Sequence, residues 1–226
     1  MRILVSGGTA SMRRFSQIPT WRPYLGHLVV PRARNRMTEI SATGLPFACD
    51  NGAFSAFNKR LFARMIQDVL PYGPEWLVLP DVVACSRVTI GLYDWWASRV
   101  LPIELAEQVP YALVAQDGLE DCDWDYWLPQ AACLFIGGST DFKLSREAAV
   151  LAQLAKQQGL AVHMGRVNSI KRLLYAAEIG CDSIDGMSFN KFGDTYIPAA
   201  VKALMEFHGD RNAATIKPAK RVRKAA

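Results

Sequence analysis

Eight short apolar or β-branched runs recur along the chain, and each is closed by Gly, Pro, Ser or Asp. They span residues 2–6, 27–30, 46–49, 76–80, 111–115, 133–136, 161–164 and 182–184. Continuous apolar runs of this length are typical of strands that are buried on both faces. Amphipathic stretches at 59–70, 146–158 and 169–179 lie between some of these runs and predict helices. Strands that alternate with helices in this way predict a parallel sheet.

The number of runs favours one parallel-sheet architecture over another. No glycine-rich dinucleotide-binding motif follows the first run, so eight strands favour a closed (β/α)8 barrel. The segment Ser6-Gly7-Gly8 leaves a doubly wound open sheet as the alternative. A chain of 226 residues suits one barrel domain. We expect residues 1–209 to form the barrel and residues 210–226, where Ala, Lys, Arg and Pro replace any apolar period, to form a basic flexible tail.

Composition narrows the class of protein. Half of the residues are hydrophobic and 21% are charged, which excludes a disordered chain. No apolar run approaches the roughly 20 residues that span a bilayer, and the first apolar stretch is too short for a signal peptide. The sequence therefore predicts a cytoplasmic protein with no membrane partner, in the host cytoplasm if the gene is viral. The net charge of +5, concentrated at residues 31–36 and in the tail, suits a polyanionic partner or simply keeps the protein soluble.

The cysteines and histidines give no sign of a metal site. Five cysteines are scattered through the chain with no CxxC or CxC pair, which predicts reduced thiols: Cys49, Cys85, Cys122, Cys133 and Cys181. His163 lies in an apolar run without a second ligand nearby, so we expect it to be a core histidine or a support for another side chain. The sequence predicts neither a metal nor a cofactor.

Polar residues and glycines follow most of the predicted strands. They are Asp50 after the third run, Asp81 after the fourth, Gln116 after the fifth, Gly137 and Gly138 after the sixth, Gly165 after the seventh and Asp185 after the eighth. The carboxyl ends of barrel strands meet at one mouth, where such enzymes place their active sites. Asp is also common in turns and at helix caps, so one alone indicates little. The whole set favours an enzyme.

Paired carboxylates indicate the class of chemistry. Two carboxylates on opposite sides of a pocket suit reactions at a glycosidic carbon, where one attacks the sugar and the other moves a proton. A third carboxylate beside a Gln and a backbone N–H can bind the edge of a guanine-like base. Phe54, shortly after Asp50, offers a face for stacking, or alternatively packs a helix onto the barrel.

Six strand-end motifs between residues 46 and 193 resemble, in order, those of the queuine tRNA-ribosyltransferase superfamily. They are CDNGAFSAF (49–57), VLPDVVA (78–84), ALVAQDG (112–118), FIGGST (135–140), VHMGRV (162–167) and GCDSIDGM (180–187). The resemblance implies that Asp185 is the nucleophile and Asp50 the acid/base. It further implies a base-binding set of Asp81, Gln116, Gly137, Gly138, Phe54 as stacking partner and Gly165 as the floor of the pocket.

The departures from the family are informative. Its tRNA enzymes carry a zinc site of closely spaced cysteines after the nucleophile, whereas no Cys follows Cys181 here, so we expect the barrel to lack the zinc-binding subdomain. Compact zinc-free members resemble DNA transglycosylases of bacterial modification islands and bacteriophages, which install 7-deazaguanines such as preQ0. The resemblance thus implies exchange of guanine in DNA for a free 7-deazaguanine base through a covalent Asp185 intermediate.

Basic residues are expected to hold the phosphates of the polymer. The candidates are Arg32, Arg34, Arg36 and Lys191, the last of which stands where the family places arginines. Three other readings stay open at this stage: a tRNA-guanine transglycosylase, a nucleosidase or DNA glycosylase that passes the sugar to water, and a non-catalytic nucleic-acid-binding barrel.

Overall fold

Eight parallel strands close into a barrel in the order β1 to β8. The computed structural model describes residues 1–33, 36–100, 109–122, 126 and 128–209. The strands are β1 (Arg2–Val5), β2 (Leu25–Val29), β3 (Phe47–Cys49), β4 (Leu77–Val78), β5 (Tyr111–Ala115), β6 (Cys133–Ile136), β7 (Ala161–Met164) and β8 (Ser183–Asp185). Each strand overlaps one of the eight predicted runs. The predicted (β/α)8 barrel is confirmed, and the open-sheet alternative is wrong because β8 pairs with β1.

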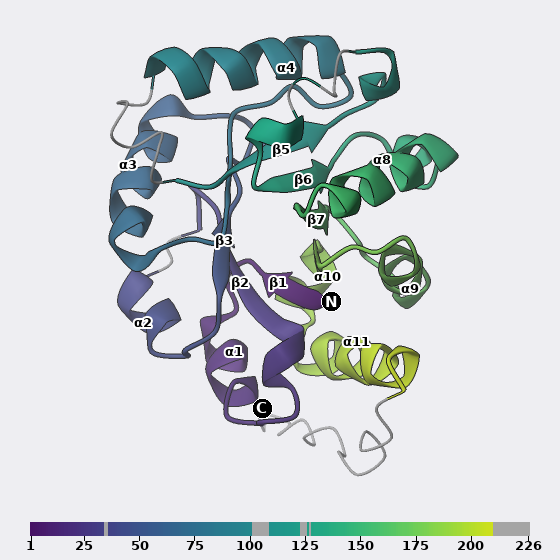
Figure 1. Ribbon diagram of the computed structural model, residues 1–226. Coiled ribbons are helices and arrows are strands. Elements are labelled where there is room, and N and C mark those ends of the chain that lie inside the picture. The colour runs from purple at the N-terminus through teal and green to yellow at the C-terminus, as the bar shows by residue number, and fades with distance from the viewer. Residues whose placement is uncertain (34–35, 101–108, 123–125, 127, 210–226) are drawn as a thin grey trace.

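Helices surround the strands on the outside (Figure 1). They are α1 (Thr9–Phe15), α2 (Met37–Ser41), α3 (Lys59–Val69), α4 (Ser86–Trp95), α7 (Thr140–Lys143), α8 (Arg146–Gln157), α9 (Ile170–Glu178), α10 (Met187–Lys191) and α11 (Gly193–Phe207). The three predicted helices correspond to α3, α8 and α9. A side-chain oxygen of Asn58, Ser145 or Ser169 accepts a backbone N–H at the start of each of them, which fixes where the helix begins. Along the described chain, no helix is both long and apolar enough to cross a membrane.

The hydrophobic residues form two layers because successive strand residues point to opposite faces. Outward-facing residues such as Ile3 and Val5 belong to the large cluster between the strands and the helices. Inward-facing residues fill the barrel, and these are Leu4, Leu28, Ala48, Trp76, Val78, Ala112, Val114, Cys133 and Phe135. The barrel is therefore packed with side chains rather than open along its axis.

The same alternation aims the strand-end residues at the barrel axis. Asp50 lies two residues beyond the inward-facing Ala48, Gln116 two beyond Val114, and Gly137 two beyond Phe135. On β8, Asp185 pairs in register with Leu4, which also faces inward. On these strands, the mouth is thus built by continuing the barrel interior by one further inward-facing residue. The predicted tail, residues 210–226, lies outside the described residues.

Candidate active site

A pocket lies at the mouth of the barrel, directly above the interior side chains. Its floor is formed by Val78, Val114 and Phe135 from three neighbouring strands. Its polar and glycine lining includes every strand-end residue predicted for the site, namely Asp50, Asp81, Gln116, Gly137, Gly138, Gly165 and Asp185. The structure therefore brings together all of the predicted catalytic and base-binding positions. Phe54 also lines this pocket.

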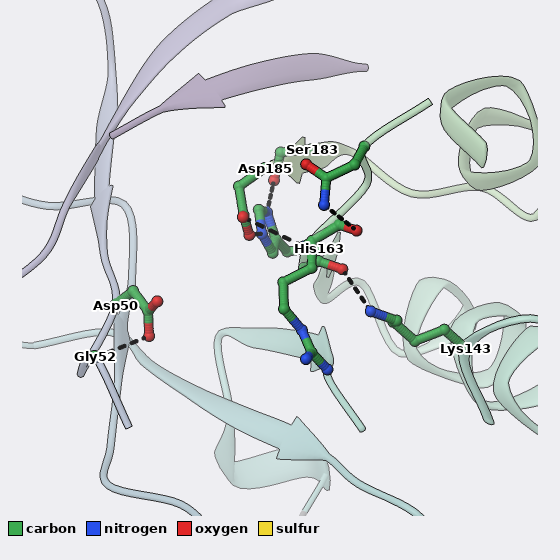
Figure 2. A network of polar contacts seen from close by, with 9 residues as sticks. Asp50, Gly52, Lys143, His163, Ser183 and Asp185 are labelled. Atoms are coloured by element: carbon green, nitrogen blue, oxygen red, sulfur yellow. Dashed lines mark hydrogen bonds and ion pairs between the residues drawn. The ribbon is translucent and has the colours of Figure 1, made fainter. Parts of the chain in front are cut away.

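Asp185 is held on one side of the pocket by a residue of β7 and a residue of the loop that follows it. The Nε2 atom of His163 lies 3.0 Å from Oδ2 of Asp185, and the backbone N–H of Arg166 donates to Oδ1 at 3.3 Å. His163 is completely buried and packs against the rings of Trp76 and Phe135. Figure 2 shows His163 between Ser183 and Asp185. The carboxylate is therefore fixed in orientation, while 17% of its side-chain surface stays exposed.

The two nitrogens of His163 have different partners. Nδ1 lies 2.8 Å from the hydroxyl of Ser183, and Nε2 contacts the Asp185 carboxylate. Because a carboxylate only accepts hydrogen bonds, Nε2 carries a proton, and a neutral ring then accepts the Ser183 hydroxyl proton at Nδ1. The expectation that His163 supports another side chain is met by this geometry, and the side chain that it supports is Asp185.

Asp50 approaches the same pocket from the end of β3. Its Oδ1 accepts the backbone N–H of Gly52 at 3.3 Å (Figure 2). Burial raises the pKa of Asp50 to about 7, and the negative charge of Asp185 adds to the increase. A carboxyl group with a pKa near neutrality can both give and accept a proton, which is the property required of an acid/base catalyst.

Asp81 belongs to a chain of amide contacts on the floor of the mouth. Its Oδ1 accepts from Nδ2 of Asn51 at 2.7 Å, and its Oδ2 accepts from Nε2 of Gln116 at 2.5 Å. Gln116 is fixed in turn by the backbone N–H of Ala84, which donates to its Oε1 at 2.8 Å. Burial raises the pKa of Asp81, whereas the bonds from Asn51 and Gln116 oppose that shift. The edge of a ligand in this pocket thus meets a rigid, pre-positioned carboxylate.

Two glycines let the backbone at the mouth pass close to neighbouring side chains. A Cβ atom on Gly165 would lie 2.7 Å from Cε1 of Phe135 and 3.4 Å from Oδ2 of Asp185. Gly138 has a φ of +72°, and a Cβ there would lie 2.5 Å from Oδ2 of Asp117. Only glycine fits either position without displacing its neighbours. The backbone of both residues therefore forms part of the pocket wall.

Arg166 forms the outer boundary of the pocket together with Phe54. Its guanidinium lies 4.1 Å from the centroid of the Phe54 ring, and its Nη2 donates to the carbonyl of Gly138. Phe54 itself is 61% exposed. The free volume inside the pocket is about 60 Å³, far below the roughly 300–1,000 Å³ of typical ligand pockets. A ligand of the size of a purine therefore does not fit this space unless side chains at its boundary move.

Backbone strain is concentrated in the loops around this pocket. Among the described non-glycine residues, only Ala84 and Arg166 have positive φ, at 58° and 59°. The N–H of Ala84 binds Gln116, and the N–H of Arg166 binds Asp185. Left-handed conformations cost about 1–3 kcal/mol at such residues and gather at functional sites. Both strained residues here orient a predicted site residue.

A groove of about 440 Å³ adjoins the pocket and shares Asp50, Phe54, Arg166 and Asp185 with it. Arg32 is the predicted phosphate-binding residue that lines this groove. Arg36 lines a neighbouring cavity, which also contacts Arg32 but neither Asp50 nor Asp185, and its guanidinium lies 3.9 Å from the carboxylate of Glu39. Lys191 is exposed and follows Asn190, which does line the groove. Arg34 lies outside the described residues.

No three His, Cys, Asp or Glu side chains gather as a metal site within the described ranges. All five cysteines are free thiols.

No protein-family model matches the chain, and no curated protein matches it either. Solved structures do resemble it. A structure described as native KDPGal aligns with a TM-score of 0.53 and 12% identity over 92% of this chain and 95% of that one. Mandelate oxidase with a C4a-OH-FMN adduct aligns with a TM-score of 0.56 and 11% identity over 92% and 73% of the two chains. The tryptophan synthase a2b2 complex of Pyrococcus furiosus aligns with a TM-score of 0.53 and 13% identity over 92% and 97%.

The chain has a TIM-barrel fold. At these identities the likeness concerns the fold alone, because this architecture carries many unrelated activities. The activity must be argued from the side chains at the mouth.

Sequence reasoning gave no role to Asn51, Lys143, Arg166 or Arg172. Asn51 directly follows Asp50, and Arg166 directly follows Gly165. Their position near the mouth could therefore have been predicted from the sequence. Lys143 and Arg172 lie in α7 and α9 and line the groove. Their positions depend on how the helices pack against the barrel, which the sequence pattern does not predict.

Proposed function

We propose that this protein is a base-exchange transglycosylase that replaces guanine in DNA with a 7-deazaguanine such as preQ0. The observation that carries the proposal is the pair of carboxylates, Asp50 and Asp185, that enter one pocket from β3 and β8. One is oriented by a buried histidine, and the other has a pKa of about 7. Nucleophilic attack and proton transfer at a glycosidic bond need these two properties.

In the first half-reaction, a carboxylate oxygen of Asp185 attacks C1′ of the target nucleotide. The C1′–N9 bond breaks with its electron pair moving to guanine, which takes a proton from Asp50 and leaves as the neutral base. His163 holds the attacking carboxylate in place and contacts it through Nε2. The target nucleotide must be flipped out of the helix to reach the pocket.

In the second half-reaction, a 7-deazaguanine occupies the pocket that guanine has left. Asp50, now ionised, takes the N9 proton, N9 attacks C1′, and the bond between C1′ and Asp185 breaks to return the carboxylate. Two inversions at C1′ give net retention of configuration. Protons and electrons balance without any further reactant.

The base-binding side of the pocket supports a guanine-like ligand. Asp81 presents a carboxylate held by Asn51 and Gln116, which matches the adjacent N–H groups of guanine. The amide N–H of Gly138 forms no hydrogen bond within the described residues and remains available to the base. Phe54 provides a stacking face once Arg166 has moved.

Incubation with isotope-labelled preQ0 and either duplex DNA or tRNA tests the proposal, followed by nucleoside analysis of each polymer. We expect the label in DNA and an equivalent amount of released guanine. Incorporation only into tRNA would contradict the choice of polymer, and release of guanine without incorporation would identify a hydrolase. An Asp68→Asn variant, which changes an exposed carboxylate on α3, serves as a control that keeps full activity.

A further inference from the structure

The groove beside the pocket extends away from the two catalytic carboxylates. It shares Asp50, Phe54, Arg166 and Asp185 with the pocket and continues along side chains from the loops after β1, β2, β6 and β7. A substrate whose sugar carbon lies at Asp185 must therefore pass its attached groups into this groove. In a nucleic-acid strand, the groups that link each sugar to the next nucleotide are phosphates.

The groove is lined by four cationic side chains: Arg32, Lys143, Arg166 and Arg172. The acidic side chains that line it are Asp50 and Asp185, the proposed catalytic pair. In the part of the chain that the structure describes, none of the three arginines forms an ion pair with a carboxylate. The groove lining therefore contains more cationic than acidic side chains, and within the described chain its arginines are not held in ion pairs.

Lys143 is the least expected of these cations because it is only 4% exposed. Its ammonium donates to the carbonyl of Gly165 at 3.1 Å (Figure 2). The pKa of Lys143 is lowered to about 8, mainly by burial and also by the nearby charges of Arg166 and Arg172, while Asp185 and Asp117 act in the opposite direction. A buried ammonium beside two guanidinium groups is unfavourable unless an anion compensates it.

The groove also presents polar groups that suit an oxyanion. The hydroxyls of Ser6 and Thr140 and the amide of Asn190 line it next to the cations. Hydroxyl and amide groups donate to phosphate oxygens, while arginine binds them in a bidentate fork.

We infer that the groove is a phosphate site, in which Arg172, Lys143 and Arg166 bind the phosphate next to the nucleotide whose base enters the pocket. This inference rests on the proposed function and deepens it, because it assigns the part of the substrate that the pocket does not hold. The same chemistry fits a phosphodiester of a strand and the phosphate monoester of a nucleotide. We assign it to the phosphodiester, and the experiment separates the two.

Binding is measured with a fluorescent single-stranded DNA of 11 nucleotides that contains one deoxyguanosine. Two analogues replace the phosphodiester on the 5′ or the 3′ side of that deoxyguanosine with an uncharged methylphosphonate. We expect one of them to bind the full-length protein about tenfold or more weakly, since a hydrogen bond to a charged group contributes about 1.5–3 kcal/mol. Arg172→Gln should weaken binding of the natural strand to a similar extent. The variant should then bind the natural strand and that analogue with equal affinity.

Two further variants separate a specific contact from a general effect of charge or folding. Lys171→Gln removes an exposed cation next to Arg172 on the same helix and should keep the full methylphosphonate effect. Arg172→Lys keeps the charge and should restore part of the binding. An equal methylphosphonate effect in wild type and Arg172→Gln, or none with either analogue, would overturn the inference.

The source of the phosphate is tested by competition. Deoxyguanosine and its 5′-monophosphate are compared as inhibitors of strand binding, and we expect both to be weak and within about twofold of each other. A monophosphate that competes far better than the nucleoside, and loses that advantage in Arg172→Gln, would assign the site to a mononucleotide and contradict the phosphodiester. These readouts do not depend on base exchange, so the phosphate site is tested separately from the proposed reaction.

Discussion

The Nε2 atom of His163 lies 3.0 Å from Oδ2 of Asp185, and both residues face the inside of the barrel from neighbouring strands. The register of β7 and β8 pairs His163 with Ser183, so Asp185 sits one inward position further along. The contact is therefore set by the strand pairing itself and does not depend on a loop. A nucleophile held from the packed interior has few alternative rotamers, which favours attack from one direction.

This geometry predicts that His163 positions the nucleophile. His163→Phe should lower the rate of covalent adduct formation by about 10–100-fold, the effect of losing a hydrogen bond to a charged group. Strand affinity should change little, because His163 lies beneath the pocket and does not line it. Rapid-quench measurement of adduct formation at saturating DNA provides the test, with the melting temperature followed in parallel.

Ser183→Ala is the matched control for His163. It leaves the donor to Asp185 in place and removes only the partner of Nδ1, so we expect a smaller loss of rate than in His163→Phe. His163→Gln, which can present an amide N–H toward Asp185, should recover part of the rate. Equal rates in wild type and His163→Phe would show that the contact has no role in the reaction.

The raised pKa of Asp50 predicts a specific dependence on pH. Asp50 must be protonated to release guanine, so the rate of adduct formation should fall as the pH rises through about 7. The free energy of unfolding should also depend on the protonation of Asp50. Between about pH 4 and pH 7 the folded protein binds a proton at Asp50 that the unfolded chain has lost, so this contribution to the free energy of unfolding decreases as pH rises.

Asp50→Asn isolates that contribution. The variant cannot titrate at this position, so its free energy of unfolding should decrease less than that of wild type between about pH 4 and pH 7, and the two curves should run parallel above that range. Urea unfolding at a series of pH values measures both. Curves that stay parallel across the whole range would contradict a raised pKa at Asp50.

Gly165 is predicted to be essential to the shape of the pocket. In Gly165→Ala the new Cβ would lie 2.7 Å from the Phe135 ring, which is buried in the barrel interior. Displacing that ring should cost about 1–3 kcal/mol, or roughly 2–4 °C in melting temperature for each kcal/mol, and should weaken base binding. Gly91→Ala is the control, since no atom lies within 4 Å of its added Cβ and it is in α4, where Ala is favoured over Gly.

The barrel and its mouth could be predicted from the sequence because both follow from local patterns. A buried strand reads as a continuous apolar run, and alternation along it makes Asp50, Gln116 and Asp185 point to the same side as the interior residues before them. The strand ends of a parallel barrel then meet at one mouth. The contact between His163 and Asp185 could not be derived in this way, because it depends on the register between strands that lie about 20 residues apart.

The charged lining of the groove could not be predicted from the sequence, for a different reason. The basic segment at residues 31–36 drew attention to Arg32 and Arg36, of which only Arg32 lines the groove, while Lys143 in α7 and Arg172 in α9 lie far from that segment in the sequence. A lone lysine in an amphipathic helix is normally exposed, and nothing in the order of residues shows that α7 places this one against the carbonyl of Gly165. Burial of this lysine is a property of the packed structure.

Replacement of each of the three carboxylates in the pocket should impair a different step of the proposed reaction. Asp185→Asn should abolish both base exchange and the denaturation-resistant protein–DNA adduct, because a carboxamide is a poor nucleophile. Asp50→Asn keeps the shape of the pocket and removes the proton donor, so adduct formation should slow by about 10²–10⁴-fold. Asp81→Ala should mainly weaken base binding, by about 1–3 kcal/mol, because the N–H groups of the base and the amides of Asn51 and Gln116 lose their acceptor.

One measurement distinguishes these assignments: the amount of adduct that survives denaturation, followed over time for each variant with Asp68→Asn as the control. We expect no adduct in Asp185→Asn, slow formation in Asp50→Asn, and formation at normal rate but higher half-saturating DNA concentration in Asp81→Ala. An adduct that persists in Asp185→Asn and disappears in Asp50→Asn would reverse the roles of the two residues. That reversal would also separate His163 from the nucleophile, since the residue it contacts is Asp185.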